Sequence, residues 1–271
     1  MRNYLLFTLF AILSTNLSAY EDFDLDGVDN KVDKCPNTPF SDLVDINGCT
    51  VKSLVSAHNF DVILGVSYSD ADYQTLNKTD TLASSIQADY YYKNFSLQAS
   101  TSYFTTSGND YGDNGLYDSF LGAAYKFKAG DSLLASVGVG VILATYETSL
   151  NNNNADYVTS ANLSYSLDKI NVFGGYSHTL INDDDVAGIV SYQNTNAMSG
   201  GLGYHFNDKL YASASYNSSD SLYSGVEDVQ TASIYTNYSI DEHLFAMFSY
   251  AYGVSDSASK NYASFRLGYF F

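Results

Sequence analysis

The stretch FDVILGVSYS, residues 60–69, alternates two kinds of side chain from one end to the other. Successive side chains of an extended strand point to opposite faces, so every second residue shares a face. The apolar face consists of Phe60, Val62, Leu64, Val66 and Tyr68, and the opposite face includes Asp61, Gly65 and Ser67. This alternation predicts a β-strand that lies between two different environments.

The same alternation returns along residues 58–271. Further apolar faces run from Leu82 to Tyr90, Phe95 to Tyr103, Tyr117 to Phe127 and Leu133 to Leu143, and strands are expected near 157–167, 170–180, 195–206, 209–217, 229–240, 243–252 and 261–271. The chain also contains 26 Tyr and 16 Phe but only 2 Pro, a composition that favours strands over helices. We therefore predict an all-β body of about twelve strands.

The predicted connections alternate between short and long. Tight turns are expected at Lys93-Asn94, Lys128 to Asp131, Asp168-Lys169, Asn207-Asp208 and Asp241-Glu242, and long polar loops near 70–80, 107–115, 148–156, 181–194, 218–228 and 253–260. Short turns on one rim, long loops on the other and an even number of antiparallel strands are typical of a transmembrane barrel. Residues 58–271 are therefore predicted to form a closed antiparallel transmembrane β-barrel.

The distribution of charge agrees with a barrel in lipid. A charge that faces lipid at mid-depth is costly, whereas a charge that faces the lumen meets water. The small-polar face carries Asp61, Gln87, Asp89, Gln98, Asp118, Lys126 and Arg266, while the apolar face has almost no ionisable residue.

The chain ends in NYASFRLGYFF, residues 261–271, with a terminal aromatic residue at Phe271. This ending resembles the C-terminal signature of Gram-negative outer-membrane barrels, and the resemblance covers about residues 58–271. It implies a porin-like barrel in contact with outer-membrane lipid. It also implies that Phe271 is part of the signal by which the barrel-assembly machinery recognises the chain.

The N-terminus has the layout of a secretory signal peptide. Arg2 precedes an apolar run from Leu5 to Leu13, and small residues follow at Ser18-Ala19. The apolar run is too short to span a bilayer, which takes about 20 residues in a helix. We expect residues 1–19 to be removed and the remainder to be exported.

Residues 22–39, DFDLDGVDNKVDKCPNTP, have the spacing of a calcium loop. Alternate carboxylates can meet around one ion, and a glycine in sixth place permits the sharp turn that the loop needs. The expected ligands are Asp22, Asp24, Asp26, Val28 through its carbonyl, Asn30 and Asp33, with Gly27 in sixth place. The alternative is an acidic, solvated linker without a metal.

Together with Cys35-Pro36 and the later VDINGC, this loop resembles a thrombospondin type 3 repeat. The resemblance implies bound Ca²⁺ in a short irregular segment, residues 20–50, followed by a linker, residues 51–57. Cys35 and Cys49 most simply form one disulfide, since exported chains meet an oxidising compartment. With the signal peptide before it and the barrel after it, the segment is expected in the periplasm.

Composition and motifs exclude several functions. The formal net charge of −18 argues against a nucleic-acid partner. Ser177 and His178 are adjacent on a strand and so face opposite sides, and neither His205 nor His243 has an assignable serine partner, so we expect no lipid hydrolase and no other enzyme.

The expected function is a narrow pore for small cationic or neutral solutes, because the inward positions are mostly small and leave space inside. Examples are Ser136, Gly138, Gly140, Ser199, Gly201, Gly203, Ser213 and Ser215. The alternative is a non-transporting barrel that serves adhesion or envelope anchoring.

Overall fold

The computed structural model describes residues 22, 24, 26, 28–39, 42–53, 57–71, 78–108, 112–130, 132–148 and 151–271. The predicted signal peptide and Gly27 lie outside these residues. The chain divides after Ala57 into two compact units, and each is described by itself. Within the described residues, no helix is long and apolar enough to cross a membrane.

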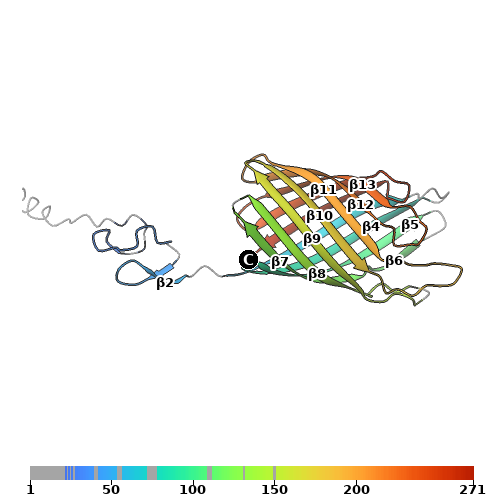
Figure 1. The fold of residues 1–271 in the computed structure, drawn as a ribbon, viewed down its shortest axis with the longest axis horizontal. Helices are drawn as coiled ribbons and strands as arrows, with labels where there is room; N and C mark the ends of the chain where they lie inside the picture. The colour runs from blue at the N-terminus through green and yellow to red at the C-terminus, as the bar shows by residue number, and fades with distance from the viewer. Residues whose placement is uncertain are drawn as a thin grey trace, which may run out of the picture. The chain divides into compact units, whose positions relative to one another are not determined.

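The second unit is a β-barrel whose strands cross the wall obliquely (Figure 1). Its strands are β3 (His58–Ala71), β4 (Thr79–Tyr92), β5 (Phe95–Gly108), β6 (Gly112–Leu116), β7 (Ser119–Ala129), β8 (Leu133–Leu143), β9 (Asp156–Leu167), β10 (Ile170–Leu180), β11 (Thr195–His205), β12 (Leu210–Ser219), β13 (Val229–Ser239), β14 (Leu244–Gly253) and β15 (Asn261–Phe270).

Every strand is antiparallel to its neighbours, and β15 pairs with β3 to close the barrel. The segments β6 and β7 both pair with β5, at its two ends, and together occupy one strand position. The barrel therefore has 12 strands, as the alternation of side chains predicted. Short connections follow β4, β7, β9, β11 and β13, and longer ones follow β3, β8, β10, β12 and β14, so the predicted alternation of short turns and long loops holds at every connection but one.

The predicted long loop at 107–115 is wrong. Strand β5 continues to Gly108 and pairs with β6, which begins at Gly112, so these residues extend a hairpin. A β-bulge separates β6 from β7. Tyr117 lies opposite Ser102, because its amide donates to the Ser102 carbonyl (2.9 Å), and Phe120 lies opposite Ser100. The three residue steps from 117 to 120 therefore oppose only two steps, from 102 to 100, on β5.

The bulge changes the side to which Tyr117 points. Its ring stacks on buried Phe104 with centroids 4.3 Å apart, and it lines a cavity on the lumen side. The sequence pattern had assigned Tyr117 to the outward face. One extra residue reverses the alternation, which explains the error.

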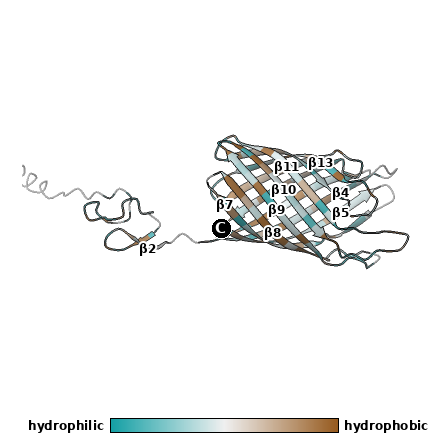
Figure 2. Ribbon diagram, viewed as in Figure 1, coloured by the Kyte–Doolittle hydropathy of each residue, from teal (hydrophilic) through white to brown (hydrophobic). Residues whose placement is uncertain are grey.

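The barrel wall has an apolar outer face and a small-polar inner face, and brown and pale or teal residues alternate along the strands in Figure 2. On the outer face, large apolar side chains such as Leu64, Val139, Leu202 and Ile234 are about half exposed. An exposed apolar belt of this extent is what a lipid-facing wall requires.

Two bands of exposed tyrosines border this apolar belt. The band near the long-loop rim contains Tyr68, Tyr103, Tyr157, Tyr176, Tyr216 and Tyr252, and the band near the short-turn rim contains Tyr92, Tyr125, Tyr165, Tyr204, Tyr238 and Tyr269. Tyrosine suits the membrane interface because its ring is apolar and its hydroxyl is polar. The bands mark the two edges of the lipid-facing surface.

A regular set of hydrogen bonds, which we call the tyrosine latches, joins the two strands of five hairpins at the long-loop rim. In each hairpin a tyrosine hydroxyl on the first strand donates to a side-chain oxygen on the second strand, at 2.7–2.9 Å. The pairs are Tyr68–Asp80, Tyr103–Asn114, Tyr176–Asn196, Tyr216–Gln230 and Tyr250–Asn261.

Hydrogen bonds also hold the seam between β15 and β3 at both rims. At the long-loop rim, Asp70 accepts from the backbone amide of Asn261 at 2.7 Å and pairs with the Lys78 ammonium at 3.2 Å. At the short-turn rim, the Phe271 amide donates to the Phe60 carbonyl at 2.8 Å. The first and last strands are thus fastened where the chain enters and leaves the barrel.

The first unit contains a short two-stranded sheet, β1 (Asp42–Val44) paired with β2 (Thr50–Ser53). The sequence pattern predicted a wholly irregular segment, and this small sheet shows that the prediction was wrong in that respect. The turn between these strands is held by Asp45, whose Oδ1 accepts from the amides of Asn47 (2.8 Å) and Cys49 (3.1 Å). These amide hydrogen bonds hold the pKa of Asp45 below its ordinary value of 3.8.

Candidate functional site

Strand register decides which side chains enter the lumen. Gln87, Asp89, Gln98, Lys126 and Arg266 all line inner cavities, as the alternation predicted. The cavities along the inner wall have volumes of about 510, 450, 320 and 420 Å³. Hydroxyl and amide groups line every one of these cavities, and charged groups line three of them, so polar groups are distributed along the inner wall.

The small inward residues leave less space than predicted. A Cβ placed at Gly140, Gly201 or Gly203 would overlap an aromatic ring from a neighbouring strand. The rings belong to Phe120, Phe173 and Tyr211, respectively, and Phe245 covers Gly268 in the same way. Because a ring occupies the space that a side chain at each glycine would take, these positions fill the wall instead of opening it.

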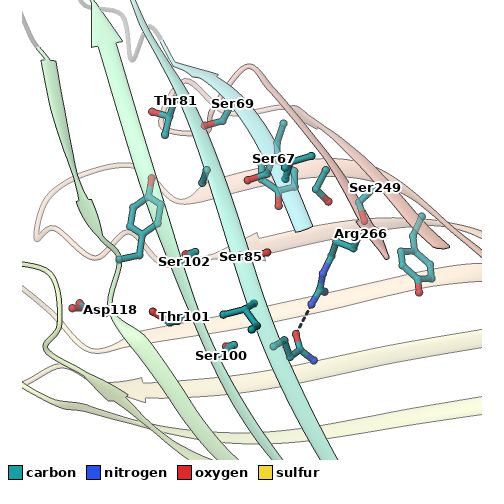
Figure 3. A pocket seen from close by; sticks show the side chains of 18 residues that line it. Ser67, Ser69, Thr81, Ser85, Ser100, Thr101, Ser102, Asp118, Ser249 and Arg266 are labelled. Carbon is teal, nitrogen blue, oxygen red and sulfur yellow. Dashed lines mark hydrogen bonds between the residues drawn. The ribbon is translucent and has the colours of Figure 1, made fainter. Parts of the chain in front are cut away.

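The largest inner cavity with a strongly polar lining, about 510 Å³, lies beside the seam (Figure 3). Its lining includes nine serine and threonine residues and three tyrosines, drawn mainly from β3, β4, β5, β13, β14 and β15. Two charged residues complete it: Asp118 at the bulge and Arg266 on β15. We refer to it as the seam cavity.

Arg266 belongs to a hydrogen-bonded chain of side chains that leads from the seam cavity toward the short-turn rim. Its Nη2 donates to Oε1 of Gln87, and Gln87 in turn donates through Nε2 to Oδ2 of Asp89 at 2.6 Å. Asp89 lies directly opposite Asp61 across β3 and β4, and Tyr91 donates its hydroxyl to Asp61 Oδ2 at 3.0 Å. The lumen thus carries both signs of charge near the short-turn rim.

The long loops at the other rim are tied together by asparagines. Asn152 Nδ2 donates to the Asp184 carbonyl at 3.2 Å, and the Asp184 amide donates to the Asn152 carbonyl at 3.0 Å. The Asn154 amide donates to Asp183 Oδ1 at 2.7 Å. The acidic run Asp183 to Asp185 is therefore held at the mouth of the barrel by the neighbouring loop.

The geometry gives no support to a serine–histidine hydrolase. His178 Nδ1 lies 2.9 Å from Oδ1 of Asn196, whereas Ser177 lines an inner cavity. The two side chains thus lie on opposite sides of the wall, as predicted. His205 packs against the Tyr211 ring, and His243 Nδ1 lies 2.9 Å from the Phe270 carbonyl.

In the first unit, three of the predicted calcium ligands come together. One carboxylate oxygen from each of Asp22, Asp24 and Asp26 lies within 4.8 Å of the others. Gly48, at a φ of 75°, packs against the carboxylates of both Asp26 and Asp33, and a Cβ there would overlap Asp33. Val28 contributes its amide, which donates to Asp26 Oδ1 at 2.8 Å.

In Asp24 and Asp26, one carboxylate oxygen accepts hydrogen bonds from backbone amides of the segment and the other is buried in the acidic cluster. Asp24 Oδ2 accepts from the amides of Asn37 (2.9 Å) and Thr38 (2.8 Å), while Asp24 Oδ1 and Asp26 Oδ2 are buried without a hydrogen-bond donor. Burial raises the pKa of Asp24, but these amide hydrogen bonds lower it more, so the carboxylate stays ionised. Buried anionic oxygens of this kind fit a hard cation such as Ca²⁺.

The sequence pattern did not reveal Thr38 and Gly48 as parts of this loop. The Thr38 hydroxyl donates to the carbonyls of Cys35 (2.8 Å) and Gly48 (2.7 Å), which draws the two halves of the segment together. Cys35 and Cys49 are joined by a disulfide, with Cα atoms 5.1 Å apart. Only the long-range contacts place these residues beside the acidic cluster.

No family model and no curated protein matches the chain. Solved structures do resemble it. An outer-membrane channel from Pseudomonas putida F1 aligns with a TM-score of 0.68 at 11% identity, covering 80% of this chain and 97% of that one. The NanC porin aligns with a TM-score of 0.50 at 17% identity, covering 77% and 97%.

The translocator domain of the autotransporter NalP from Neisseria meningitidis also aligns, with a TM-score of 0.50 at 15% identity, covering 80% and 88%. At such low identity these similarities define the fold, which is that of an outer-membrane β-barrel. The similar structures include a channel, a porin and a translocator domain, so the fold alone does not define the function.

Proposed function

We propose that this protein is a narrow outer-membrane pore for small hydrophilic solutes. The observation that carries the proposal is the polar inner wall, where charged, amide and hydroxyl groups line successive cavities of about 320 to 510 Å³. A barrel whose interior only supports the wall is filled by packed side chains. The proposed location is the outer membrane of a Gram-negative bacterium, with the short-turn rim and the N-terminal unit in the periplasm.

Ion conductance across a planar lipid bilayer tests the pore directly. We expect the refolded protein to give discrete conductance steps in potassium chloride, with a modest preference for cations. The carboxylates of Asp183, Asp184 and Asp185 at the long-loop mouth raise the local cation concentration. Absence of any conductance would refute the pore and favour the non-transporting barrel for adhesion or envelope anchoring.

A triple variant, Asp183→Asn with Asp184→Asn and Asp185→Asn, should reduce the cation preference without closing the pore. Asparagine preserves the side-chain oxygen that accepts from Asn154 and from Tyr192. The reversal potential under a salt gradient measures the effect. The difference between parent and variant should nearly vanish at 1 M salt, where the screening length falls to about 3 Å; a difference that persists there would refute the electrostatic explanation.

We further propose that the N-terminal unit binds one Ca²⁺ through Asp22, Asp24, Asp26, Val28, Asn30 and Asp33. The convergence of three carboxylates and the buried, donor-less oxygens of Asp24 and Asp26 support this proposal. The ion would offset the repulsion between the carboxylates and so stabilise the closed loop.

The double variant Asp24→Ala with Asp26→Ala should abolish calcium uptake by the mature protein, measured by titration calorimetry. The control is Asp29→Ala with Asp42→Ala, which removes the same charge from residues outside the proposed ligand set. The Cys35–Cys49 disulfide should still form in both variants, as a thiol count would show. Equal calcium affinity in the parent and the ligand variant would support the acidic-linker alternative.

A further inference from the structure

Arg266 stands apart from the other charged residues of the lumen. It is the single arginine in the chain after Arg2, and its side chain lines the seam cavity in Figure 3. A guanidinium has five N–H donors in a fixed plane and stays charged at any physiological pH. The question is what these donors bind.

Within the described residues, few of the N–H donors of the Arg266 guanidinium form hydrogen bonds with the protein. The hydrogen bond of the Arg266 side chain goes to Gln87 Oε1, a neutral amide oxygen. Among the described residues, the ion pair shorter than 4.0 Å joins Lys78 and Asp70 and does not involve Arg266. Gln87 stands between the guanidinium and Asp89, so Arg266 keeps its charge without a carboxylate in direct contact.

The wall is built to place the guanidinium in this position. Arg266 pairs with Gly65 across the seam, and a Cβ at position 65 would lie 2.9 Å from Arg266 Cγ and 2.6 Å from Ser85 Oγ. The missing side chain at Gly65 lets the arginine stem cross β3 and reach β4. A bulkier residue at 65 would push the stem away from the wall.

The surroundings of Arg266 are rich in hydroxyl groups. Figure 3 shows Ser67, Ser85, Ser102 and Ser249 among the side chains that line the same cavity. Hydroxyls donate and accept hydrogen bonds, and the tyrosine rings of the lining add flat apolar surface. The volume of about 510 Å³ lies in the range of small-molecule sites.

From these observations we propose that the seam cavity is a solute site that binds a polyhydroxylated molecule carrying one carboxylate. The carboxylate pairs with the Arg266 guanidinium in a two-pronged hydrogen bond, and the solute hydroxyls bind the serine and threonine hydroxyls around it. This inference rests on the proposed pore and names a class of solute for it. It does not conflict with a cation preference at the mouth, because Arg266 acts by contact, whereas the loop charges act over the screening length of about 8 Å.

The test combines conductance with binding. Glucuronate is the probe, with glucose as the uncharged analogue and glucosamine as the cationic one. In a bilayer, glucuronate should interrupt the ion current at concentrations at which the two analogues do not. Titration calorimetry of the protein in detergent should give binding of glucuronate that is stronger than that of glucose.

Arg266→Gln should weaken glucuronate binding by about tenfold or more, since a charge-assisted pair is lost. Arg266→Lys should give an intermediate loss, because it keeps the charge without the planar fork. Gly65→Val should also weaken glucuronate binding, although it leaves the Arg266 guanidinium and the carboxylate of the solute unchanged. Lys126→Gln is the matched control: it removes one positive charge from the lumen near Tyr91, outside the seam cavity, and should leave glucuronate binding unchanged.

Each variant is first shown to be folded by its heat-dependent shift in gel mobility. Conductance without preferential glucuronate binding, or equal losses in Arg266→Gln and Lys126→Gln, would overturn the site and leave the pore intact. Glucuronate binding without conductance would overturn the pore and support the site. If the protein neither conducted ions nor bound glucuronate preferentially, both proposals would be overturned.

Discussion

Replacing Ile234 with lysine is expected to lower the free energy of unfolding of the barrel by about 2–4 kcal/mol, the cost of a lipid-facing charge near mid-depth. Ile234 lies at the middle of β13, and 49% of its surface is exposed on the apolar outer face. The neighbouring residue, Ser233, faces the lumen, where its hydroxyl lies 2.8 Å from that of Ser215.

Ser233→Lys is therefore the matched control, one position away on the same strand. It should cost less, about 1–2 kcal/mol for the two side-chain hydrogen bonds that Ser233 makes with Ser215 and Asn217, because the new charge meets water. Urea titrations of both variants folded into lipid vesicles provide the measurement. Equal destabilisation by the two lysines would contradict the assignment of outer and inner faces.

Phe271→Asp should remove most of the assembled barrel from the membranes of cells that express it. The Phe271 amide closes the seam through the Phe60 carbonyl, and its ring contacts the Tyr269 ring with centroids 4.8 Å apart. Once folded, the variant should be nearly as stable as the parent, since a charge near the interface costs about 0–1 kcal/mol. We therefore attribute the expected loss to the predicted role of Phe271 as an insertion signal that is read before the chain folds.

Phe206→Asp offers the matched control. Phe206 also follows a strand at the short-turn rim, is exposed, and contacts a tyrosine ring, that of Tyr204, with centroids 5.0 Å apart. It differs in not being the terminal residue. The amount of heat-modifiable protein in outer-membrane fractions should fall far more for Phe271→Asp, and similar yields of the two variants would argue against the insertion signal.

The strands and their faces could be predicted because a period of two is a local property of the sequence. Phe60 to Tyr68 show their outward face without reference to any other strand. Features that depend on register between strands were missed: the bulge beside Tyr117, the extended hairpin that ends at Leu116, and the ring of Phe120 over Gly140. Each of these requires knowing which residue lies opposite which, and that information is spread over distant parts of the chain.

Each of the two candidate sites also combines features that could be predicted from the sequence with features that could not. The carboxylates of Asp22, Asp24 and Asp26 follow one another at alternate positions, so their meeting could be predicted from spacing alone. The part played by Thr38 and Gly48 could not, because both approach the cluster through folding of the segment. Arg266 was correctly placed in the lumen, but its isolation from carboxylates depends on Gln87, which lies on another strand.

The tyrosine latches have a consequence for how this barrel changes over generations. Each latch fixes the pairing of two strands just below the tip of a hairpin, as Tyr176 does with Asn196 and Tyr216 with Gln230. Insertions and substitutions beyond a latch are therefore expected to leave the pairing below it in place. Hairpin tips of different length or sequence can thereby be carried on the same barrel wall, because the latch beneath each tip keeps the two strands in register.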